Sequence, residues 1–151
     1  LLARVAAAAG SIHASLSVDS IARMVTEEAR SIIGAHQAIT SLTIGSDWSQ
    51  AINAMSLSEK YAAYREYTEP PTGRGIYAEV CRTNRPMRLT QAALEAHPAW
   101  RGFGDQRTAH PPMRGYLAVP LVGHGGRNLG VIQLSDRIEG EFTADDEAVL
   151  V

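Results

Sequence analysis

An apolar hairpin in the last third of the chain is the feature that most constrains its fold. Two apolar runs, at residues 116–122 and 129–134, flank the glycine-rich segment "GHGGRN". Short apolar runs bounded by glycines are typical of buried strands, and a short loop between two strands makes them antiparallel neighbours. The chain is therefore expected to form an antiparallel sheet with at least one covered face.

The glycine-rich segment has part of the pattern of a phosphate-binding loop. Gly125 and Gly130 have the glycine spacing of the motif G-x-x-x-x-G-K-[ST]. However, Val131 and Ile132 stand where the motif requires lysine and serine or threonine, and a strand follows where it requires a helix. The segment is therefore predicted to be a hairpin loop whose glycines supply positive φ angles.

Apolar residues at helical spacing predict two helices at the start of the chain. The first covers residues 1–16 and is weakened near its middle by Gly10. In the second, Ser17 is placed to cap the N-terminus and Gly34 to end the helix. Its apolar residues, which are expected to face the core, are Ile21, Met24, Val25, Ile32 and Ile33.

The middle of the chain alternates short predicted strands and helices. Period-two spacing over residues 37–44 and 50–55 predicts a second hairpin. Ser56 and Glu59 have the spacing of a capping box, which predicts a helix that continues to Tyr67. The other predicted elements are a helix over 76–83 ended by Asn84, a short strand over 87–89, a helix over 91–96 capped by Thr90, and a last helix after Thr143. Adjacent strands with helices grouped around them predict an α+β layered domain.

Composition and charge argue against several classes of function. The chain has 151 residues, enough for one domain, and a net charge of -2, which gives no electrostatic reason to bind nucleic acid. No apolar run approaches the roughly 18 residues that span a bilayer, so direct membrane contact is not expected. The single cysteine excludes an internal disulfide and is compatible with a cytoplasmic location. Both ends have the pattern of unfinished helices, so residues 1–151 are expected to be one domain of a longer protein.

A long segment without regular spacing, residues 97–115, is the predicted ligand site. It combines aromatic and apolar side chains with cations, a composition that suits an amphipathic or anionic small ligand. The candidate contacts are Trp100, Arg101, Phe103, His110, Met113 and Arg114, with Tyr116 where the segment enters the next strand. The alternative is that the aromatic residues anchor the loop to the core while the arginines are solvated.

Cys81 and the five histidines are the remaining candidates for chemistry. Cys81 lies on the apolar face of the helix predicted over 76–83, so it is expected to be a small buried side chain, and it remains a candidate ligand contact. No histidine makes an i, i+4 pair or a cluster with cysteine at metal-ligand spacing. No nucleophile motif and no obvious pair of carboxylates is present. The domain is therefore expected to be non-catalytic, and the alternative is a small enzyme that uses Cys81 or His110.

Three segments, in this order, resemble the GAF domain family. "GIYAEVCRTNRPMRL" is similar to the family's helix-to-strand passage G-x-x-x-x-V-x-x-x-x-x-P. "GYLAVPLVGHGGRNLGVIQLSD" is similar to its late hairpin, in which a P-L strand and an L-G-V-I strand flank a turn of small residues. "FTADDEAVL" is similar to its closing helix, which starts F-[ST]-x-x-D. The resemblance extends over nearly the whole chain.

The resemblance implies a fold and a role. The fold is an antiparallel sheet of five or six strands, with terminal helices on one face and short helices and loops over a ligand pocket on the other. The role is that of a sensor and dimerisation module, in which an unidentified small molecule shifts the packing of the terminal helices and so signals to adjacent domains of the same chain. A homodimer through these helices is expected. The implied parent is a bacterial two-component sensor histidine kinase, with this domain in the cytoplasm even where the parent is membrane-associated.

Alternatives to this role remain open. One alternative is that the parent protein is a transcriptional regulator or a protein of cyclic-nucleotide turnover. Another is that the domain is a structural dimerisation unit without a ligand. The resemblance assigns no cofactor. Cys81 is followed by Arg82, where bilin-binding relatives commonly have histidine, and the cyclic-nucleotide signature N-K-x-x-x-F-x-x-x-D-E is absent. One cysteine is also too few for the related free-methionine-sulfoxide reductases.

Overall fold

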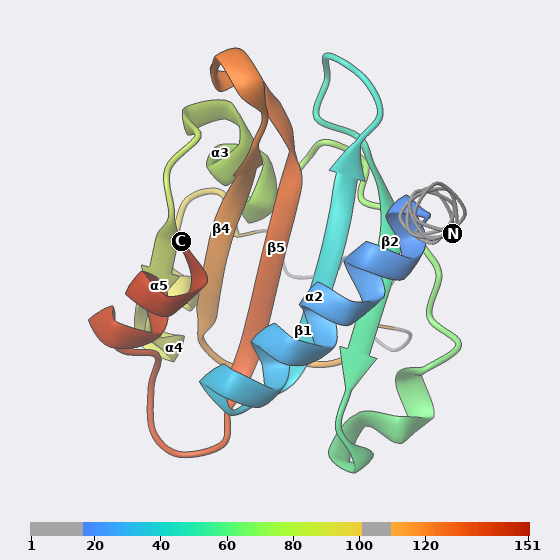
Figure 1. The fold of residues 1–151 in the computed structure, drawn as a ribbon. Coiled ribbons are helices and arrows are strands. Elements are labelled where there is room, and N and C mark those ends of the chain that lie inside the picture. Colours follow the sequence, from blue (N-terminus) through green and yellow to red (C-terminus); the bar gives the residue numbers. More distant parts are fainter. Residues whose placement is uncertain (1–16, 101–109) are drawn as a thin grey trace, which may run out of the picture.

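The computed structural model describes residues 17–100 and 110–151, which form a sheet with helices on both faces (Figure 1). The strands are β1 (Ala35–Thr43), β2 (Gln50–Leu57), β3 (Met87–Leu89), β4 (Tyr116–Val122) and β5 (Asn128–Arg137). The helices are α2 (Val18–Ile33), α3 (Ile76–Thr83), α4 (Gln91–Ala96) and α5 (Ala144–Leu150), with the 3-10 turns η1 (Glu59–Tyr64) and η3 (His124–Gly126). The helix predicted over residues 1–16 lies outside the described residues.

Neighbouring strands of the described sheet are antiparallel. Their order is β2-β1-β5-β4-β3, with β5 at the centre. Ile132 of β5 lies opposite Thr40 of β1 on one side and opposite Val119 of β4 on the other. The predicted α+β class, the antiparallel sheet and both hairpins, β1–β2 and β4–β5, are therefore confirmed.

Helices α2 and α5 cover one face of the sheet (Figure 1). Alternate positions of the central strands point to this face, because successive side chains of a strand point to opposite sides. The buried members of this core are Ala29, Ile33, Ala35, Ala38, Leu117, Val119, Ile132, Leu134 and Phe142. The helices near the two ends of the described chain thus share one face of the sheet.

The opposite face carries a second core beneath α3 and α4. Helix α3 packs on β4 and β5, and α4 lies beside β3. The buried members of this core are Ile76, Val80, Cys81, Leu94, Tyr116, Ala118 and Val131. Over β1 and β2 the same face is covered by segments without regular structure, and this is where the cavity described below lies.

The face that α2 presents to the sheet differs from the predicted one. Ile21, Met24, Val25 and Ile32 are exposed, and of the predicted set only Ile33 is buried. The buried residues of the helix are Ala22, Thr26, Ala29 and Ile33. Small side chains let the helix lie close to the sheet, and the hydroxyl of Thr26 is satisfied at 2.6 Å from the Thr40 hydroxyl of β1. The helix therefore has two apolar stripes, and only the stripe of smaller residues packs on the sheet.

The segment after β2 also differs from its prediction. Ser56 does not cap a helix, because β2 continues through it to Leu57. Its hydroxyl instead accepts a hydrogen bond from Nε of Arg30 at 2.6 Å and donates one to Glu27, which ties β2 to α2. The following helix is the short turn η1, whose N-cap is Ser58 and which ends at Tyr64 rather than Tyr67. The capping-box spacing was thus coincidental, because a strand hydroxyl had a partner on a neighbouring element.

The glycine-rich segment is a hairpin loop, as predicted. Gly125 and Gly126 have φ angles of 80° and 79°, and the amide of Gly123 donates to the carbonyl of Arg127 at 2.8 Å. The carbonyl of Gly126 accepts a hydrogen bond from the side chain of Asn84, the residue that ends α3, at 2.9 Å. The glycines therefore close the β4–β5 hairpin, and the strand that follows them forms the centre of the sheet.

Candidate functional site

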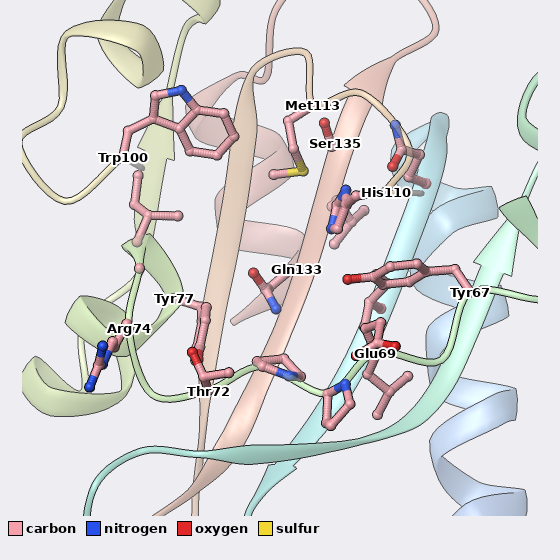
Figure 2. A pocket seen from close by; sticks show the side chains of 18 residues that line it. Tyr67, Glu69, Thr72, Arg74, Tyr77, Trp100, His110, Met113, Gln133 and Ser135 are labelled. Carbon is pink, nitrogen blue, oxygen red and sulfur yellow. The ribbon is translucent and has the colours of Figure 1, made fainter. Parts of the chain in front are cut away.

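A cavity of about 590 Å³ lies on the face of the sheet that α3 only partly covers (Figure 2). This volume is within the range of roughly 300–1,000 Å³ found for small-molecule sites. Its floor is formed by side chains of β1, β2 and β5, and its walls by two segments from distant parts of the chain. The lining residues are Gln37, Ile39, Ile52, Tyr67, Glu69, Pro70, Pro71, Thr72, Arg74, Gly75, Ile76, Tyr77, Trp100, His110, Met113, Gln133, Leu134 and Ser135.

Gln133 is a polar side chain of the floor whose orientation is set by a neighbouring core residue. It lies on the central strand between Tyr77 and His110 in Figure 2. The hydroxyl of Tyr116, a fully buried side chain, donates to Oε1 of Gln133 at 2.8 Å. A donor bound to Oε1 fixes which end of the carboxamide is oxygen and which is nitrogen. Nε2 is therefore the end of the carboxamide that faces the cavity.

The walls of the cavity are rich in aromatic side chains. Tyr67 packs edge-on against the imidazole of His110, with ring centroids 4.9 Å apart. Tyr77 is held from α3, where its hydroxyl accepts a hydrogen bond from the amide of Gly73. Trp100 lies on the opposite side of the floor from Tyr67 and His110 (Figure 2). Aromatic walls of this kind suit a flat ligand, because ring faces and edges pack favourably against one another.

His110 contributes an uncharged imidazole to this wall. Its burial lowers the pKa, and the hydrogen bond to the carbonyl of Pro111 raises it by less, so the net pKa lies below the usual value of 6.5. Near neutral pH the ring is therefore neutral. Its Nδ1 lies 2.6 Å from that carbonyl oxygen, which makes this nitrogen the protonated one.

The charged side chains of the lining belong to the mouth rather than the floor. Glu69 and Arg74 are both exposed, and they carry opposite charges. In Figure 2, Arg74 extends away from the group of labelled side chains around Gln133. Within residues 17–100 and 110–151, the interior of the cavity is thus polar through amides and hydroxyls and not through formal charge.

Hydrogen bonds from the sheet hold the two walls in place. Nε2 of Gln37 donates to the carbonyl of Pro112 at 2.7 Å, and the hydroxyl of Ser135 accepts from the amide of Arg114 at 2.8 Å. On the other side, Tyr61 of η1 donates to Oδ2 of Asp136 at 2.6 Å, and Lys60 forms an ion pair with the same oxygen. The wall that ends at Arg114 and the turn η1, which precedes the other wall, are therefore both tied to the same end of β5.

The structure brings three of the predicted ligand contacts together and separates others. Trp100, His110 and Met113 line the cavity. Arg114 is exposed and does not belong to the lining, while Tyr116 is buried beside the floor and acts on it through Gln133. Two further candidates, Arg101 and Phe103, lie outside the described residues.

Cys81 lies in the core beneath α3 and is not part of the cavity lining. Its side chain is fully buried, and Nε2 of Gln50 donates to its sulfur at 3.0 Å. Burial raises the pKa of the thiol, and the hydrogen bonds from Gln50 and Thr43 offset this only in part. A buried, protonated thiol is a poor nucleophile, because the thiolate is the reactive form.

Several lining residues were not predicted from the sequence. Gln133 is a polar residue in an apolar strand, and this break in the pattern was the available signal for it. Tyr67, Tyr77, Ile39 and Ile52 gave no such signal, since aromatic and branched side chains at strand or helix positions usually belong to a core. Their role in the cavity depends on which segments the fold brings together.

The described part of the chain offers neither a metal site nor a membrane-spanning helix. Residues 17–100 and 110–151 contain no group of three or more His, Cys, Asp or Glu side chains placed to hold a metal ion. None of the helices in these ranges has both the length and the apolar character needed to cross a membrane.

Known proteins to which this chain is similar include several GAF domains. The family model described as GAF domain matches residues 15–151. Among solved structures, the chain is similar to the GAF domain of the cyanobacteriochrome TePixJ, with 17% identity, coverage of 89% of this chain and 82% of that chain, and a TM-score of 0.67. It is also similar to the GAF domain of a phosphoenolpyruvate-protein phosphotransferase from Coxiella burnetii, with 18% identity, coverage of 93% and 79%, and a TM-score of 0.67. Residues 122 to 287 of a methyl-accepting chemotaxis protein match with 15% identity, coverage of 93% and 86%, and a TM-score of 0.68.

Proposed function

This chain belongs to the GAF domain family, and we propose that it is a non-catalytic module that senses a small molecule in the cavity between β5 and the two walls. The carrying observation is the cavity itself, which has an apolar, aromatic lining and an oriented polar group on its floor. Such a combination is typical of small-molecule sites. The occurrence of similar domains in a cyanobacteriochrome and in a chemotaxis protein supports a sensory role.

The central strand provides a route from the cavity to the helices on the other face. Gln133 of β5 faces the cavity, whereas its neighbour Ile132 packs in the core beneath α2 and α5. A ligand that binds one arrangement of β5 more tightly than another shifts the populations of the two arrangements. The proposed output is a change in the packing of α2 and α5, with a coupling free energy of about 1–3 kcal/mol.

We further propose that the domain dimerises through the exposed stripe of α2. Ile21, Met24 and Val25 are apolar and solvent-exposed along that helix, and Val18 and Ile32 extend the stripe toward both of its ends. A contiguous apolar surface of this kind usually marks an interaction site. In a homodimer the same stripe would meet its symmetry mate, so that a shift of α2 in one copy reaches the other.

For the parent protein we propose a cytoplasmic sensory context, with a two-component histidine kinase as the leading candidate. The support is the membership of the GAF family together with similar domains in sensory proteins. A transcriptional regulator or a protein of cyclic-nucleotide turnover is the alternative. An enzyme based on Cys81 is not favoured, because the thiol is buried and lies outside the cavity lining.

A screen of metabolites by thermal unfolding tests the sensing function. A compound at about 100 times its Kd is expected to stabilise the native domain by about 2.7 kcal/mol. The variant Ile39→Phe places a larger side chain in the cavity and should abolish this stabilisation, whereas Ile138→Phe, at an exposed position after β5, should not. Hydrogen exchange of α2 and α5 should change with the ligand in the wild type. Stabilisation that is equal in both variants would place the binding elsewhere and contradict the proposal.

A further inference from the structure

We propose that the cavity selects an uncharged, planar compound with a hydrogen-bond acceptor, and that Nε2 of Gln133 donates to this acceptor. The inference rests on the proposed sensing function and names the chemical class of the ligand. It follows from three properties of the cavity: the orientation of one carboxamide, the shape of the walls, and the position of the charges.

The orientation of Gln133 is set from outside the cavity. Tyr116 is fully buried, and its hydroxyl lies 2.8 Å from Oε1 of Gln133 as the donor. A carboxamide oxygen accepts and a carboxamide nitrogen donates, so this bond commits the oxygen end to the protein. Among the described residues, Nε2 has no hydrogen-bond partner, and it faces the cavity from the middle of the floor (Figure 2). The floor therefore presents the N–H donors of Nε2 to the ligand, while Oε1 is already engaged by Tyr116.

The other amide near the floor is already engaged. Nε2 of Gln37 donates to the carbonyl of Pro112, where it holds the wall that carries Met113. The hydroxyl of Ser135 is likewise bound, to the amide of Arg114 and the carbonyl of Gly115. Gln133 is thus the polar group of the floor whose hydrogen-bonding capacity remains for a ligand.

The walls favour a flat molecule. Tyr67, Tyr77 and Trp100 contribute ring faces and edges around the floor (Figure 2), and Ile39 of β1 and Ile52 of β2 add apolar surface to the lining. A planar ligand buries its apolar surface against these side chains while its edge reaches Gln133. A volume of about 590 Å³ accommodates two or three fused rings, within the range of drug-sized ligands.

The charges favour a ligand without net charge. Glu69 and Arg74 are exposed at the mouth and balance each other, and His110 is neutral because burial lowers its pKa. A carboxylate or phosphate placed on the floor would lose its hydration, and Arg74 of the described lining extends away from Gln133 (Figure 2). A carbonyl oxygen or ring nitrogen requires only the donor that Gln133 provides.

Chromone and naphthalene test this inference as a matched pair of probes. Both are flat bicyclic compounds without charge, but only chromone has a carbonyl acceptor. Isothermal titration of the intact domain should show that chromone binds about ten-fold more tightly than naphthalene, the difference that one good hydrogen bond supplies. In Gln133→Met, which keeps the length of the side chain and removes the donor, chromone should lose its advantage and bind no more tightly than naphthalene. The variant Gln133→Glu at pH 8 keeps an acceptor for Tyr116 and replaces the donor by an oxygen, so it should also lose the preference.

The possible outcomes distinguish failure of the proposed ligand class from failure of the proposed sensing function. Equal affinities in the wild type, or a preference that survives both variants, would overturn the role of Gln133 and leave the sensing function standing. Binding of a charged metabolite that Ile39→Phe abolishes, with no binding of either probe, would also overturn the ligand class alone. Failure of both probes and of every screened metabolite would contradict the sensing function as well. A single cooperative thermal unfolding transition of each Gln133 variant verifies that it folds, even though Gln133→Met loses the bond to Tyr116.

Discussion

The buried hydroxyl of Tyr116 donates a hydrogen bond to Oε1 of Gln133 at 2.8 Å, and so a core residue orients the polar group of the cavity floor. Tyr116 has no exposure to solvent and belongs to the core beneath α3, whereas Gln133 belongs to the cavity lining. This bond links stability of the sheet to selectivity of the site.

Removal of that hydroxyl is the first test. Tyr116→Phe should lower the free energy of unfolding by about 1 kcal/mol, because one hydrogen bond is lost. The loss should be no larger, because Oε1 of Gln133 can accept a hydrogen bond from water in the open cavity and does not remain unpaired. The carboxamide then rotates freely, so the preference for chromone over naphthalene should decrease without being lost. Urea unfolding and titration measure the two effects. An unchanged preference would mean that Gln133 is oriented by something other than Tyr116.

The ion pair at the end of β5 predicts a pH dependence of stability. Burial raises the pKa of Asp136, but the hydrogen bonds of Lys60 and Tyr61 and the charge of Lys60 outweigh it, so the net pKa lies below 3.8. A carboxylate with a lowered native pKa stabilises the fold above its unfolded pKa and loses that contribution as the pH falls through the native value. The free energy of unfolding should therefore fall on acidification below about pH 4.

Asp136→Asn isolates this contribution from those of the other acids. The φ angle of Asp136 is 58°, a conformation that asparagine adopts readily, so the backbone should be retained. At pH 7 the variant should be less stable by about 2 kcal/mol, because Lys60 loses its partner. Its acid slope should be shallower than that of the wild type, although Asp146, whose pKa is also lowered on balance, still contributes. Parallel slopes for variant and wild type would contradict the assignment.

The burial of Cys81 predicts a slow thiol. The side chain is fully buried, and its pKa is raised chiefly by burial. At pH 8 the native domain should react with a disulfide reagent far more slowly than the urea-unfolded chain, because attack requires both exposure and deprotonation. Native and unfolded reaction rates can be compared by absorbance. A rapid stoichiometric reaction of the native domain would revive the enzymatic alternative.

Two glycines of the β4–β5 region should respond differently to alanine. A Cβ at Gly130 would lie 2.1 Å from the carbonyl oxygen of Ser41 on the neighbouring strand, and its φ is +155°. Gly130→Ala should therefore cost about 3 kcal/mol or more, since backbone must move. Gly125 has a φ of +80°, but a Cβ added there would meet no atom within 4 Å, so Gly125→Ala should cost about 1 kcal/mol. Equal losses in thermal or urea unfolding would contradict these assignments of strain to the hairpin.

The exposed stripe of α2 predicts how association can be disrupted. Ile21→Glu should leave the unfolding free energy of the monomer within about 0.5 kcal/mol, because the position is exposed, and should weaken dimerisation at least ten-fold. The control is Arg23→Glu, an exposed change on the same helix, on the side opposite the apolar stripe at 100° per residue. Sedimentation over a range of concentrations measures both. A wild-type domain that stays monomeric at high concentration would rule out the proposed interface.

Local sequence patterns predicted the elements and their ends well. Ser17, Thr90 and Thr143 cap α2, α4 and α5 through side-chain hydrogen bonds, as their positions indicated. Gly34 and Asn84 end α2 and α3 in the left-handed conformation. These features depend on residues three or four positions apart, and such neighbours are close in space whatever the rest of the chain does.

The errors have a common origin in contacts between distant segments. The sequence of α2 contains two apolar stripes, and helical spacing alone cannot choose between them. The stripe with Ala22 and Ala29 packs on the sheet, because small side chains allow a close approach of the helix that Ile21 and Met24 would prevent. Ser56 likewise had a capping pattern but found partners on α2 instead.

The sequence by itself thus determined the strands, the helices α2, α3, α4 and α5, the hairpin loop and the family. Only the tertiary structure decided where the cavity lies and what it offers a ligand. Its lining joins Gln37, Tyr67, Trp100 and Gln133 from four separate parts of the chain, and the orientation of Gln133 depends on Tyr116 of the adjacent strand. A cavity is the space that packed segments leave between them, so its position follows from long-range packing rather than from local sequence patterns.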